Sequence, residues 1–455
     1  MKRTTGVFTA LALASALAMG GGARAAEDES VVQEVLGILK ERGLVDQEEY
    51  ERLALKNASY EKKQATSFLS KIQWSGDMRL RMENFWYDTP DCSGLAINCD
   101  PVENDQSNRA RFRYRVRVGA LAPINDYVDA GFRLASGEDD LRSTNQSAGR
   151  NNPDFDPDSI FIDQAYVTFK APKDWLGEGG SLKATGGKIA NPFLWKNSKD
   201  YMLWDNDINP EGGAILLALK PAEMWTLYGN TGYFILDENT SAKDPHVFGV
   251  QGGFGVTPTD TTELGARASW YEWQSLDGDF YQRGIDNTNL NGSAGSTSQA
   301  GGNLPGGLSD GSKFGAGELA AYFRYAGIEG WPIRVFGHYA QNFDAEDTLG
   351  ADEEDTGWGG GLEIGDPKKF VLLGAGYYEL EANFWPSQFT DSDLFDGVTN
   401  RKGWTVYAAR QVFTNTELNL TLFSSDAIED DVPPFADSVQ NSDRFRLQTD
   451  IVVKF

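Results

Sequence analysis

The chain divides into two regions that differ in the spacing of their apolar residues. Within residues 27–66, apolar residues recur at helical spacing, and Asp46 followed by Glu49 forms the capping-box signature that opens a helix. From Ile72 to the C-terminus, apolar and polar residues alternate instead, in short segments separated by Asn, Asp, Gly and Pro. The sequence therefore predicts a short helical or coiled-coil arm followed by an all-β region.

The alternating region divides into sixteen segments. Most of them have the about nine to eleven residues that a tilted β-strand needs to cross a bilayer. An even number of short amphipathic strands favours an antiparallel barrel. The predicted strands are 72–87, 108–122, 127–137, 159–170, 181–190, 212–220, 225–236, 246–256, 261–273, 316–327, 332–343, 357–365, 369–385, 403–413, 416–426 and 443–455.

The connections between these segments alternate in length. Short turns such as APIND, PAEM, TPTD, GDPK and TN follow even-numbered strands, whereas long segments follow odd-numbered ones. Short turns at one end and long loops at the other are typical of bacterial outer-membrane barrels. We therefore predict a transmembrane antiparallel β-barrel of about 16 strands. The long segments are 88–107, 138–158, 191–211, 274–315 and 386–402.

Arginine occupies every second position of the stretch RARFRYRVRV, residues 109–118. A period of two places these side chains on one face of a strand. An arginine that faces lipid at the bilayer midplane costs about 2–4 kcal/mol, so this face is expected to meet a hydrated lumen. Closure of the barrel brings the first three strands and the last one together. The predicted pore-lining residues are Arg79, Arg81, Arg109, Arg111, Arg113, Arg115, Arg117, Arg133, Arg444 and Arg446.

Charge and the N-terminus limit the class of protein. The formal net charge is −26, and nucleic-acid binding needs a net basic face, so we exclude a nucleic-acid partner. A positive n-region, the apolar stretch Val7–Met19, and Ala23 with Ala25 predict a Sec-type signal peptide; an uncleaved anchor is the alternative. No later apolar run is long enough for a transmembrane helix. The predicted domains are a signal peptide at 1–25, a helical periplasmic arm at 26–70 and an outer-membrane β-barrel at 71–455.

Several segments resemble the bacterial Putative porin family of outer-membrane β-barrel porins. They are GDMRLRMENF, NRARFRYRVRVG, GFRLASGE, IDQAYVTF and GGKIANPF, together with the preceding ILKERGLVDQEEYERL and the terminal phenylalanine. The resemblance covers essentially the whole mature chain and implies a passive outer-membrane channel that assembles as a homotrimer. Phe455 on an amphipathic last strand is similar to the sorting signal that the barrel-assembly machinery reads. The resemblance supplies no substrate.

In general porins the third long loop folds into the lumen opposite a basic wall, and by similarity we expect residues 191–212 to narrow the pore. A transverse field between wall and loop would orient dipolar solutes and bias ion passage. The alternative is an external loop with solvated acids. The field is expected between Arg111, Arg113 and Arg115 on the wall and Asp205 and Asp207 on the loop, and the predicted constriction residues are Asp200, Asp205, Asp207 and Glu211.

Two further patterns suggest local features of loops. Cys92 and Cys99, the only cysteines, predict one small disulfide loop in an exported protein. Asp154, Asp156 and Asp158 alternate in NNPDFDPDS and are a weak candidate for Ca²⁺ binding. The glycine and the distal glutamate of an EF-hand loop are missing, so we favour a solvated acidic turn and predict no cofactor.

Aromatic residues near the predicted strand ends suggest girdles at the two membrane interfaces. Each one also fits an ordinary packed position, so the indication comes from the set. The set is Phe85, Trp86, Tyr87, Trp225, Trp270, Tyr271, Trp273, Trp331, Phe384, Trp385 and Trp404.

The leading prediction is an outer-membrane porin for passive diffusion of small hydrophilic solutes and ions. The arginines also fit a substrate-specific channel for phosphate or carboxylates, and the arm also fits a structural tether without conductance. His246 and His338 lie in no recognisable catalytic motif, so we predict no enzyme. The expected partners are outer-membrane lipid, lipopolysaccharide, and the solutes themselves. The arm serves either trimerisation or contact with the cell wall, or is a plain spacer.

Overall fold

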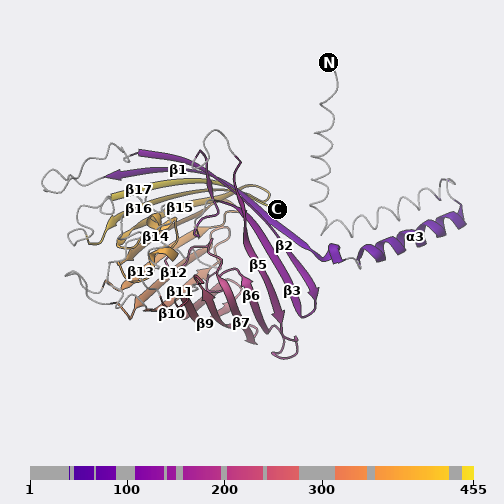
Figure 1. The fold of residues 1–455 in the computed structure, drawn as a ribbon. Helices are drawn as coiled ribbons and strands as arrows, with labels where there is room; N and C mark the ends of the chain where they lie inside the picture. Colours follow the sequence, from indigo (N-terminus) through magenta and orange to yellow (C-terminus); the bar gives the residue numbers. More distant parts are fainter. Residues whose placement is uncertain are drawn as a thin grey trace, which may run out of the picture.

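The computed structural model describes residues 40, 42, 46–65, 68–88, 108–137, 141–149, 157–195, 202–238, 243–275, 313–345, 354–429 and 443–455. They form a closed, antiparallel β-barrel of 16 strands, preceded by one helix (Figure 1). The barrel strands are β1 (Gln73–Asp88), β2 (Asn108–Asn125), β3 (Val128–Ser136), β5 (Ile160–Lys170), β6 (Ser181–Lys188), β7 (Glu211–Ala222), β8 (Trp225–Ile235), β9 (His246–Thr259), β10 (Thr262–Gln274), β11 (Lys313–Tyr325), β12 (Ile333–Asn342), β13 (Thr356–Gly365), β14 (Leu372–Leu380), β15 (Arg401–Phe413), β16 (Thr416–Ala427) and β17 (Asp443–Lys454).

The first strand closes the barrel. β1 pairs antiparallel with β2 on one side and with β17 on the other, and the backbones of Gly76 and Phe455 exchange two hydrogen bonds at the seam. A short strand, β4 (Gln146–Ser147), adds to β2 beyond the end of β3. Closure of this kind leaves no exposed strand edge, which a barrel in lipid requires because lipid offers no hydrogen-bond partners.

The sixteen predicted strands are confirmed. The largest difference in bounds is at β14, which ends at Leu380 rather than continuing to 385, because the chain turns into the barrel there. Connections at the end that holds the chain's C-terminus are short, with 171–180 the longest of them. The other end carries the long connections, so the alternation read from the sequence is present in the structure.

The two faces of each strand differ as period-two alternation predicts. In β1, Met78, Leu80 and Met82 are exposed on the outside, while Arg81 and Glu83 between and beside them are buried, at 3% and 0% exposure. Apolar side chains on the outer face suit contact with lipid. Polar side chains on the inner face need hydrogen-bond partners or water, so the barrel interior must supply one or the other.

An aromatic cluster fills one side of that interior, which corrects the girdle prediction. Tyr271, Trp273 and Trp385 have essentially no exposed surface, whereas Trp270 and Trp404 are exposed on the outside. The buried rings have the inward parity of their strands or lie on segments that fold inward, and Trp385 contacts Tyr271 and Trp273 edge to face. Proximity to a strand end therefore does not make an aromatic residue interfacial.

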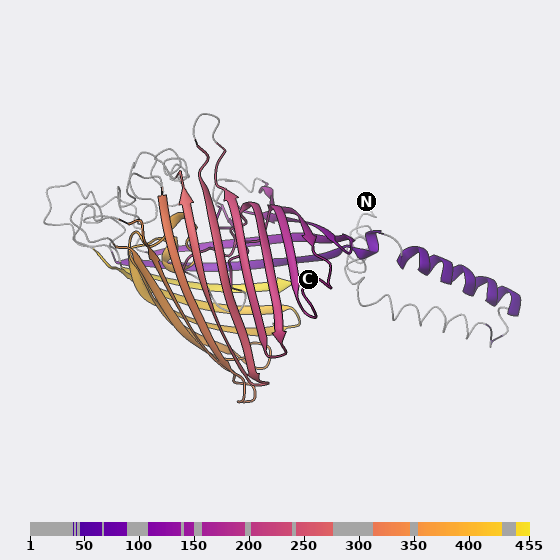
Figure 2. The same cartoon turned by 90° about the horizontal axis from the view of Figure 1, so that it is seen from below.

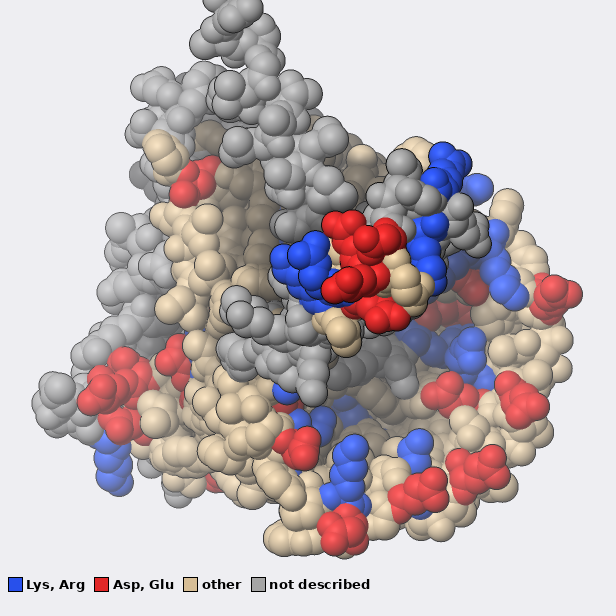
Figure 3. Space-filling model, turned by 90° about the vertical axis from the view of Figure 1, so that its right-hand side faces the viewer, with Lys and Arg blue, Asp and Glu red and all other residues tan. Residues whose placement is uncertain are grey.

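The arm contains helix α3 (Gln47–Ala65), followed by the 3₁₀ turn η1 (Phe68–Lys71). The Asp46 carboxylate accepts a hydrogen bond of 2.8 Å from the Glu49 backbone N–H, as an N-cap does. α3 projects away from the barrel (Figure 2), and on that side basic and acidic side chains lie interspersed (Figure 3). None of the described helices is long and apolar enough to cross a membrane.

Candidate functional site

The arginines of β1, β2, β3 and β17 gather on one side of the barrel interior, which we call the arginine wall. The pairing of β1 with β2 places Arg79 opposite Arg115 and Arg81 opposite Arg113. Like charges in directly opposite positions destabilise a sheet unless they are neutralised. The wall consists of Arg79, Arg81, Arg111, Arg113, Arg115, Arg117, Arg133, Arg444 and Arg446.

Acidic residues on the same strands and on the neighbouring β5 neutralise much of the wall. Glu83 is fully buried; it accepts a 2.6 Å hydrogen bond from Arg111 and a short one from Arg446. Asp77 bridges Arg115 and Arg117 at 2.9 and 2.7 Å. Other pairs are Arg81 with Asp450 at 2.7 Å and Arg133 with Asp163. Buried charges persist only when paired in this way.

Two connections fold into the barrel and face this wall. One comprises 189–195 and 202–210, the described parts of the connection that contains the predicted third long loop, and the other is 381–400, which contains the 3₁₀ turns η3 (Ser387–Phe389) and η4 (Leu394–Gly397). Both pack through aromatic rings: Trp204 of the first lies 5.3 Å from Trp385 and 5.8 Å from Phe389 of the second, centroid to centroid. The rings bury the loops against β10, the strand that carries Tyr271 and Trp273.

Each loop presents an Asp-x-Asp turn, and the turns have matching geometry. In each, the first aspartate accepts a 2.8 Å hydrogen bond from the backbone N–H of the second. The turns also bond to each other: Ser392 N–H donates to Asp205 at 2.7 Å, and the Asn206 amide donates to Asp391 at 3.4 Å. We call residues 205–207 and 391–393 the paired Asp turns.

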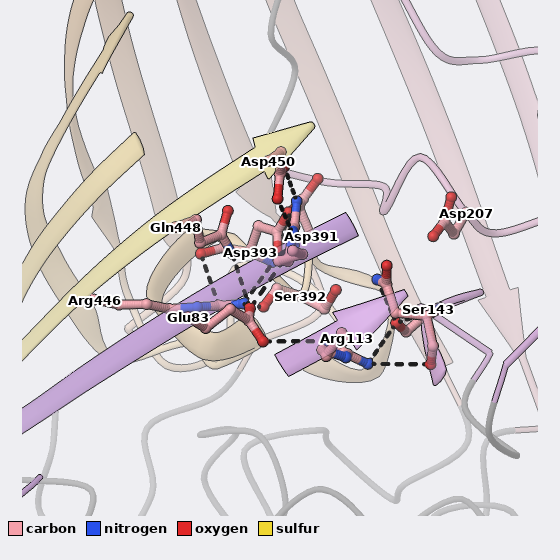
Figure 4. A network of polar contacts seen from close by, with 12 residues as sticks. Glu83, Arg113, Ser143, Asp207, Asp391, Ser392, Asp393, Arg446, Gln448 and Asp450 are labelled. Carbon is pink, nitrogen blue, oxygen red and sulfur yellow. Dashed lines mark hydrogen bonds and ion pairs between the residues drawn. The ribbon is translucent and has the colours of Figure 1, made fainter. Parts of the chain in front are cut away.

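The second aspartate of each turn reaches the arginine wall. Asp207 lies 3.5 Å from Arg115 and 3.1 Å from Arg117. Asp393 lies 2.7 Å from Arg81 and 3.0 Å from Arg446 (Figure 4). The paired Asp turns thus connect the two loops to different parts of one wall.

The four carboxyl groups of the paired Asp turns differ in pKa: it is raised for the first aspartate of each turn and lowered for the second. Burial, and then the neighbouring Asp207 carboxylate, raises the pKa of Asp205 to about 7. Burial and the Asp205 charge raise the pKa of Asp391 well above its usual value. Burial acts in the same direction on the second aspartates, but guanidinium groups outweigh it: Arg115 and Arg117 lower the pKa of Asp207, and Arg81 and Arg446 lower that of Asp393.

Buried arginines outside the wall hold the loops in place. Arg142 donates to the backbone carbonyls of Ser387 and Gly397 at 3.0 and 2.7 Å, which fixes the loop 381–400. Arg267, paired with Glu318 at 2.5 Å, donates to the Phe193 carbonyl at 3.1 Å and fixes the loop 189–210. Both loops are therefore fixed at two places, by aromatic packing and by charge-assisted hydrogen bonds.

A polar cavity of about 490 Å³ remains between the wall and the turns. Of the described residues, six arginines and five aspartates line it. With all of them ionised, this lining carries one net positive charge; with Asp205 and Asp391 protonated, it carries three. The rest of the lining is neutral: the polar side chains of Asn145, Asn206, Ser392, Asn419, Thr421 and Gln448, and the apolar side chains of Phe423 and Val452.

The sequence profile of a family described as Putative porin matches residues 9–304 and 307–455. This chain belongs to that family. Porins are non-enzymatic channels of the outer membrane, so the barrel is a porin-like outer-membrane channel, and the prediction of no enzymatic activity is confirmed. No curated protein sequence matches the chain.

Solved structures of outer-membrane proteins are similar to this porin. OprB of Pseudomonas putida, in a high-pH structure, is 10% identical, with a TM-score of 0.52 over 85% of this chain and 95% of that one. The outer-membrane channel DcaP of Acinetobacter baumannii is 10% identical (TM-score 0.45; 84% and 97% covered). OmpF of Salmonella typhi, in complex with daunomycin, is 11% identical (TM-score 0.45; 84% and 97% covered). At these identities the likeness to OprB supports the barrel fold alone.

The structure brings some of the predicted site residues together and separates others. Asp207 contacts Arg115 and Arg117, whereas Arg111 and Arg113 of the expected field lie beside Glu83 instead. Arg109 lies outside the cavity lining, with its guanidinium above the Phe85 ring. Glu211 begins β7 and pairs with Lys188 at 2.8 Å, also away from the cavity.

Five residues of other predicted sites lie outside the described residues: Asp200, Asp154, Asp156, Cys92 and Cys99. Asp158 is described and accepts a hydrogen bond from the Tyr114 hydroxyl. Within the described part of the chain, no group of three or more His, Cys, Asp or Glu side chains has the arrangement of a metal site.

Sequence reasoning missed Asp77 and Glu83, the acids of the wall, and the whole of the second turn. Signals for them were present. Asp77 and Glu83 continue the period of two set by Arg79 and Arg81, so all four share one strand face. The DND and DSD triplets of the paired Asp turns are also visible as a repeat in the sequence.

Proposed function

We propose that this porin is a passive diffusion channel for small hydrophilic solutes and ions, with its path running along the arginine wall. The observation that carries the proposal is the polar cavity of about 490 Å³ between the wall and the paired Asp turns, inside a closed barrel. A purely structural barrel has no need of a charged internal cavity, which is costly to build. Along a hydrated path, water solvates the charged side chains and lowers this cost in free energy.

The two sides of this path carry opposite formal charge. Arg115 and Arg117 approach from the wall, and Asp207 and Asp393 from the turns, so a solute in the adjoining cavity meets a field directed from the wall to the turns that orients its dipole. Most of these charges neutralise one another in ion pairs. The lining retains a small net positive charge, so we propose a preference for anions over cations.

A substrate-specific anion channel is the second candidate, and the excess of arginine over aspartate in the cavity favours it. A tether without conductance is the third, supported by the projecting helix α3. The three candidates differ in what passes through the barrel, so one electrical measurement separates them.

That measurement is the conductance of the purified porin in planar bilayers across a salt gradient. Open channels whose reversal potential has the sign of anion selectivity support the proposal. Open channels with cation selectivity would show that acidic loops at the mouth control passage. Correctly folded protein that never conducts would favour the tether.

Assembly and export belong to the same proposal. We propose a homotrimer in the outer membrane, exported by the signal peptide at 1–25, with the arm at 26–70 on the periplasmic side and contacts to lipopolysaccharide at the long loops. The terminal Phe455, paired with Gly76 at the barrel seam, is proposed as the sorting signal. Cys92 and Cys99 are proposed to form a disulfide. The mass of the complex in detergent, by light scattering, tests the trimer.

A further inference from the structure

One arginine of the cavity differs from the rest in its partners. Arg81, Arg115, Arg117 and Arg133 each contact a carboxylate, and Arg142 donates to backbone carbonyls. Among the described residues, Arg79 contacts neither; its Nε and Nη2 atoms both donate to the side-chain oxygen of Asn145, at 3.1 and 2.6 Å. An amide oxygen orients a guanidinium but does not neutralise it.

The position of Arg79 makes this charge costly. It lies directly opposite Arg115 in the β1–β2 pair, two residues from Arg81 and on the same strand face. Like charges at these positions repel each other. Arg115 pairs with two carboxylates and Arg81 with three, whereas among the described residues Arg79 has no carboxylate within ion-pair distance, and Asp207 and Asp393 act on it only from farther away. An anion from solution that bound Arg79 would offset the cost.

The geometry around Arg79 suits an oxyanion. Asn145 uses one edge of the guanidinium, and Nη1 makes no hydrogen bond among the described residues while the side chain lines the cavity. A guanidinium binds planar carboxylates and phosphates through charge-assisted N–H donors, an arrangement that a spherical chloride cannot match. Asn419 and Thr421, also in the lining, carry neutral N–H and O–H donors able to hydrogen-bond the remaining oxygens.

We propose that the cavity is a binding site for small oxyanions, with Arg79 as the direct ligand and Asn145 as the residue that positions it. This inference rests on the proposed function, and it adds a substrate class to it. The carboxylates of Asp207 and Asp393, which approach the same wall, keep the binding weak enough for the anion to leave, as conduction requires.

The test is block of chloride current by oxyanions in planar bilayers. Succinate and inorganic phosphate are added separately, at constant chloride, to wild-type porin and to Arg79→Gln. We expect wild-type current to be blocked at millimolar concentrations and the variant to need about 10-fold more oxyanion, the effect of losing one charge-assisted hydrogen bond. Block by succinate alone would assign the site to carboxylates, and block by phosphate alone to phosphate.

Two further variants separate a specific site from general charge. Arg324→Gln removes an exposed arginine from a second cavity, lined also by Glu263, Tyr322 and Arg334, and should leave the block unchanged. Arg79→Lys keeps the charge and loses the planar fork, so we expect chloride conductance to persist while oxyanion block weakens. If Arg79→Lys were blocked as strongly as the wild type, a positive charge alone would suffice for binding, and the role of the planar guanidinium would be overturned.

Folding and transport are checked separately. Each variant must show the heat-modifiable electrophoretic mobility of a folded barrel. Equal block in wild type and Arg79→Gln would overturn the oxyanion site while leaving the porin intact. If the wild type does not conduct, the proposed function fails, and calorimetric titration of detergent-solubilised wild type and Arg79→Gln with phosphate and succinate decides the binding site independently.

Discussion

The two sides of the barrel interior are built on different physical principles. On the arginine wall, charged side chains lie in pairs such as Glu83 with Arg446, and a polar cavity remains beside them. On the opposite side, aromatic rings such as those of Trp273 and Trp385 pack without exposed surface and leave little space for water. Aromatic packing fixes where the loops lie, and ion pairing sets the charge that a solute meets. One side therefore positions the two loops, and the other gives the cavity beside them its electrostatic character.

The largest effect is expected from breaking the aromatic side. Trp385→Ala removes a ring that contacts Trp204, Tyr271 and Trp273 at centroid distances of 5.1–5.5 Å. Loss of such a buried ring costs about 3–5 kcal/mol of stability and frees the loop 381–400. We expect a lower midpoint of urea unfolding and a larger, noisier single-channel conductance. Trp404→Ala, which removes a ring exposed on the outer face, should leave the conductance unchanged.

On the wall, the corresponding test is Glu83→Gln. It leaves Arg446 and Arg111 without their shared buried carboxylate, and breaking a buried pair in this way costs near the lower end of about 3–5 kcal/mol, because the amide keeps the side-chain shape. Glu211→Gln breaks the exposed pair with Lys188 and should cost about 0–1 kcal/mol. Urea unfolding of both variants measures the difference, and equal effects would show that the wall is not a buried network.

A smaller, electrical effect is expected from the paired Asp turns. Asp205→Asn with Asp207→Asn removes the acidic groups of the first turn, one of which faces Arg115 and Arg117. A unit charge at about 7 Å in a water-like dielectric changes an ion's free energy enough for about a three-fold change in permeability. We expect the anion-to-cation permeability ratio, calculated from the reversal potential, to rise by about three-fold. Asp174→Asn, on an exposed short turn, is the control; unchanged conductance and selectivity in the double variant would exclude the constriction.

These two sides also differ in how far the sequence predicts them. The barrel was predictable because each strand's orientation follows from a local period of two, and the wall arginines share that period. The acids Asp77 and Glu83 share it as well. The aromatic side was misassigned because its burial depends on loops far away in the sequence: Trp273 is buried by Trp204 and Trp385, which lie 69 and 112 residues away, and no local pattern reports those contacts.

The same limit applies to the paired Asp turns. Their two triplets are visible in the sequence, but nothing local shows that Ser392 bonds Asp205 or that Asn206 bonds Asp391. The chemistry of the turns depends on that contact, because an isolated Asp-x-Asp turn in water would leave both carboxylates ionised at neutral pH. Burial raises the pKa of all four carboxyl groups, and the arginine wall lowers it again only for the second aspartate of each turn, so the first aspartate favours the proton and the second does not.

The smallest expected effect follows from that division and concerns pH. Asp205, with a pKa raised to about 7 by burial and by Asp207, is mostly neutral one unit below that value and mostly ionised one unit above it. Raising the pH through 7 therefore removes positive charge from the cavity lining, and we expect the anion-to-cation permeability ratio to fall by about two-fold or less. Reversal potentials at the two pH values measure it. In Asp205→Asn, which cannot ionise, the ratio should stay constant over the same interval; a slope that persisted there would assign the titration to another group, and a flat wild-type profile would show that the turn is open to water.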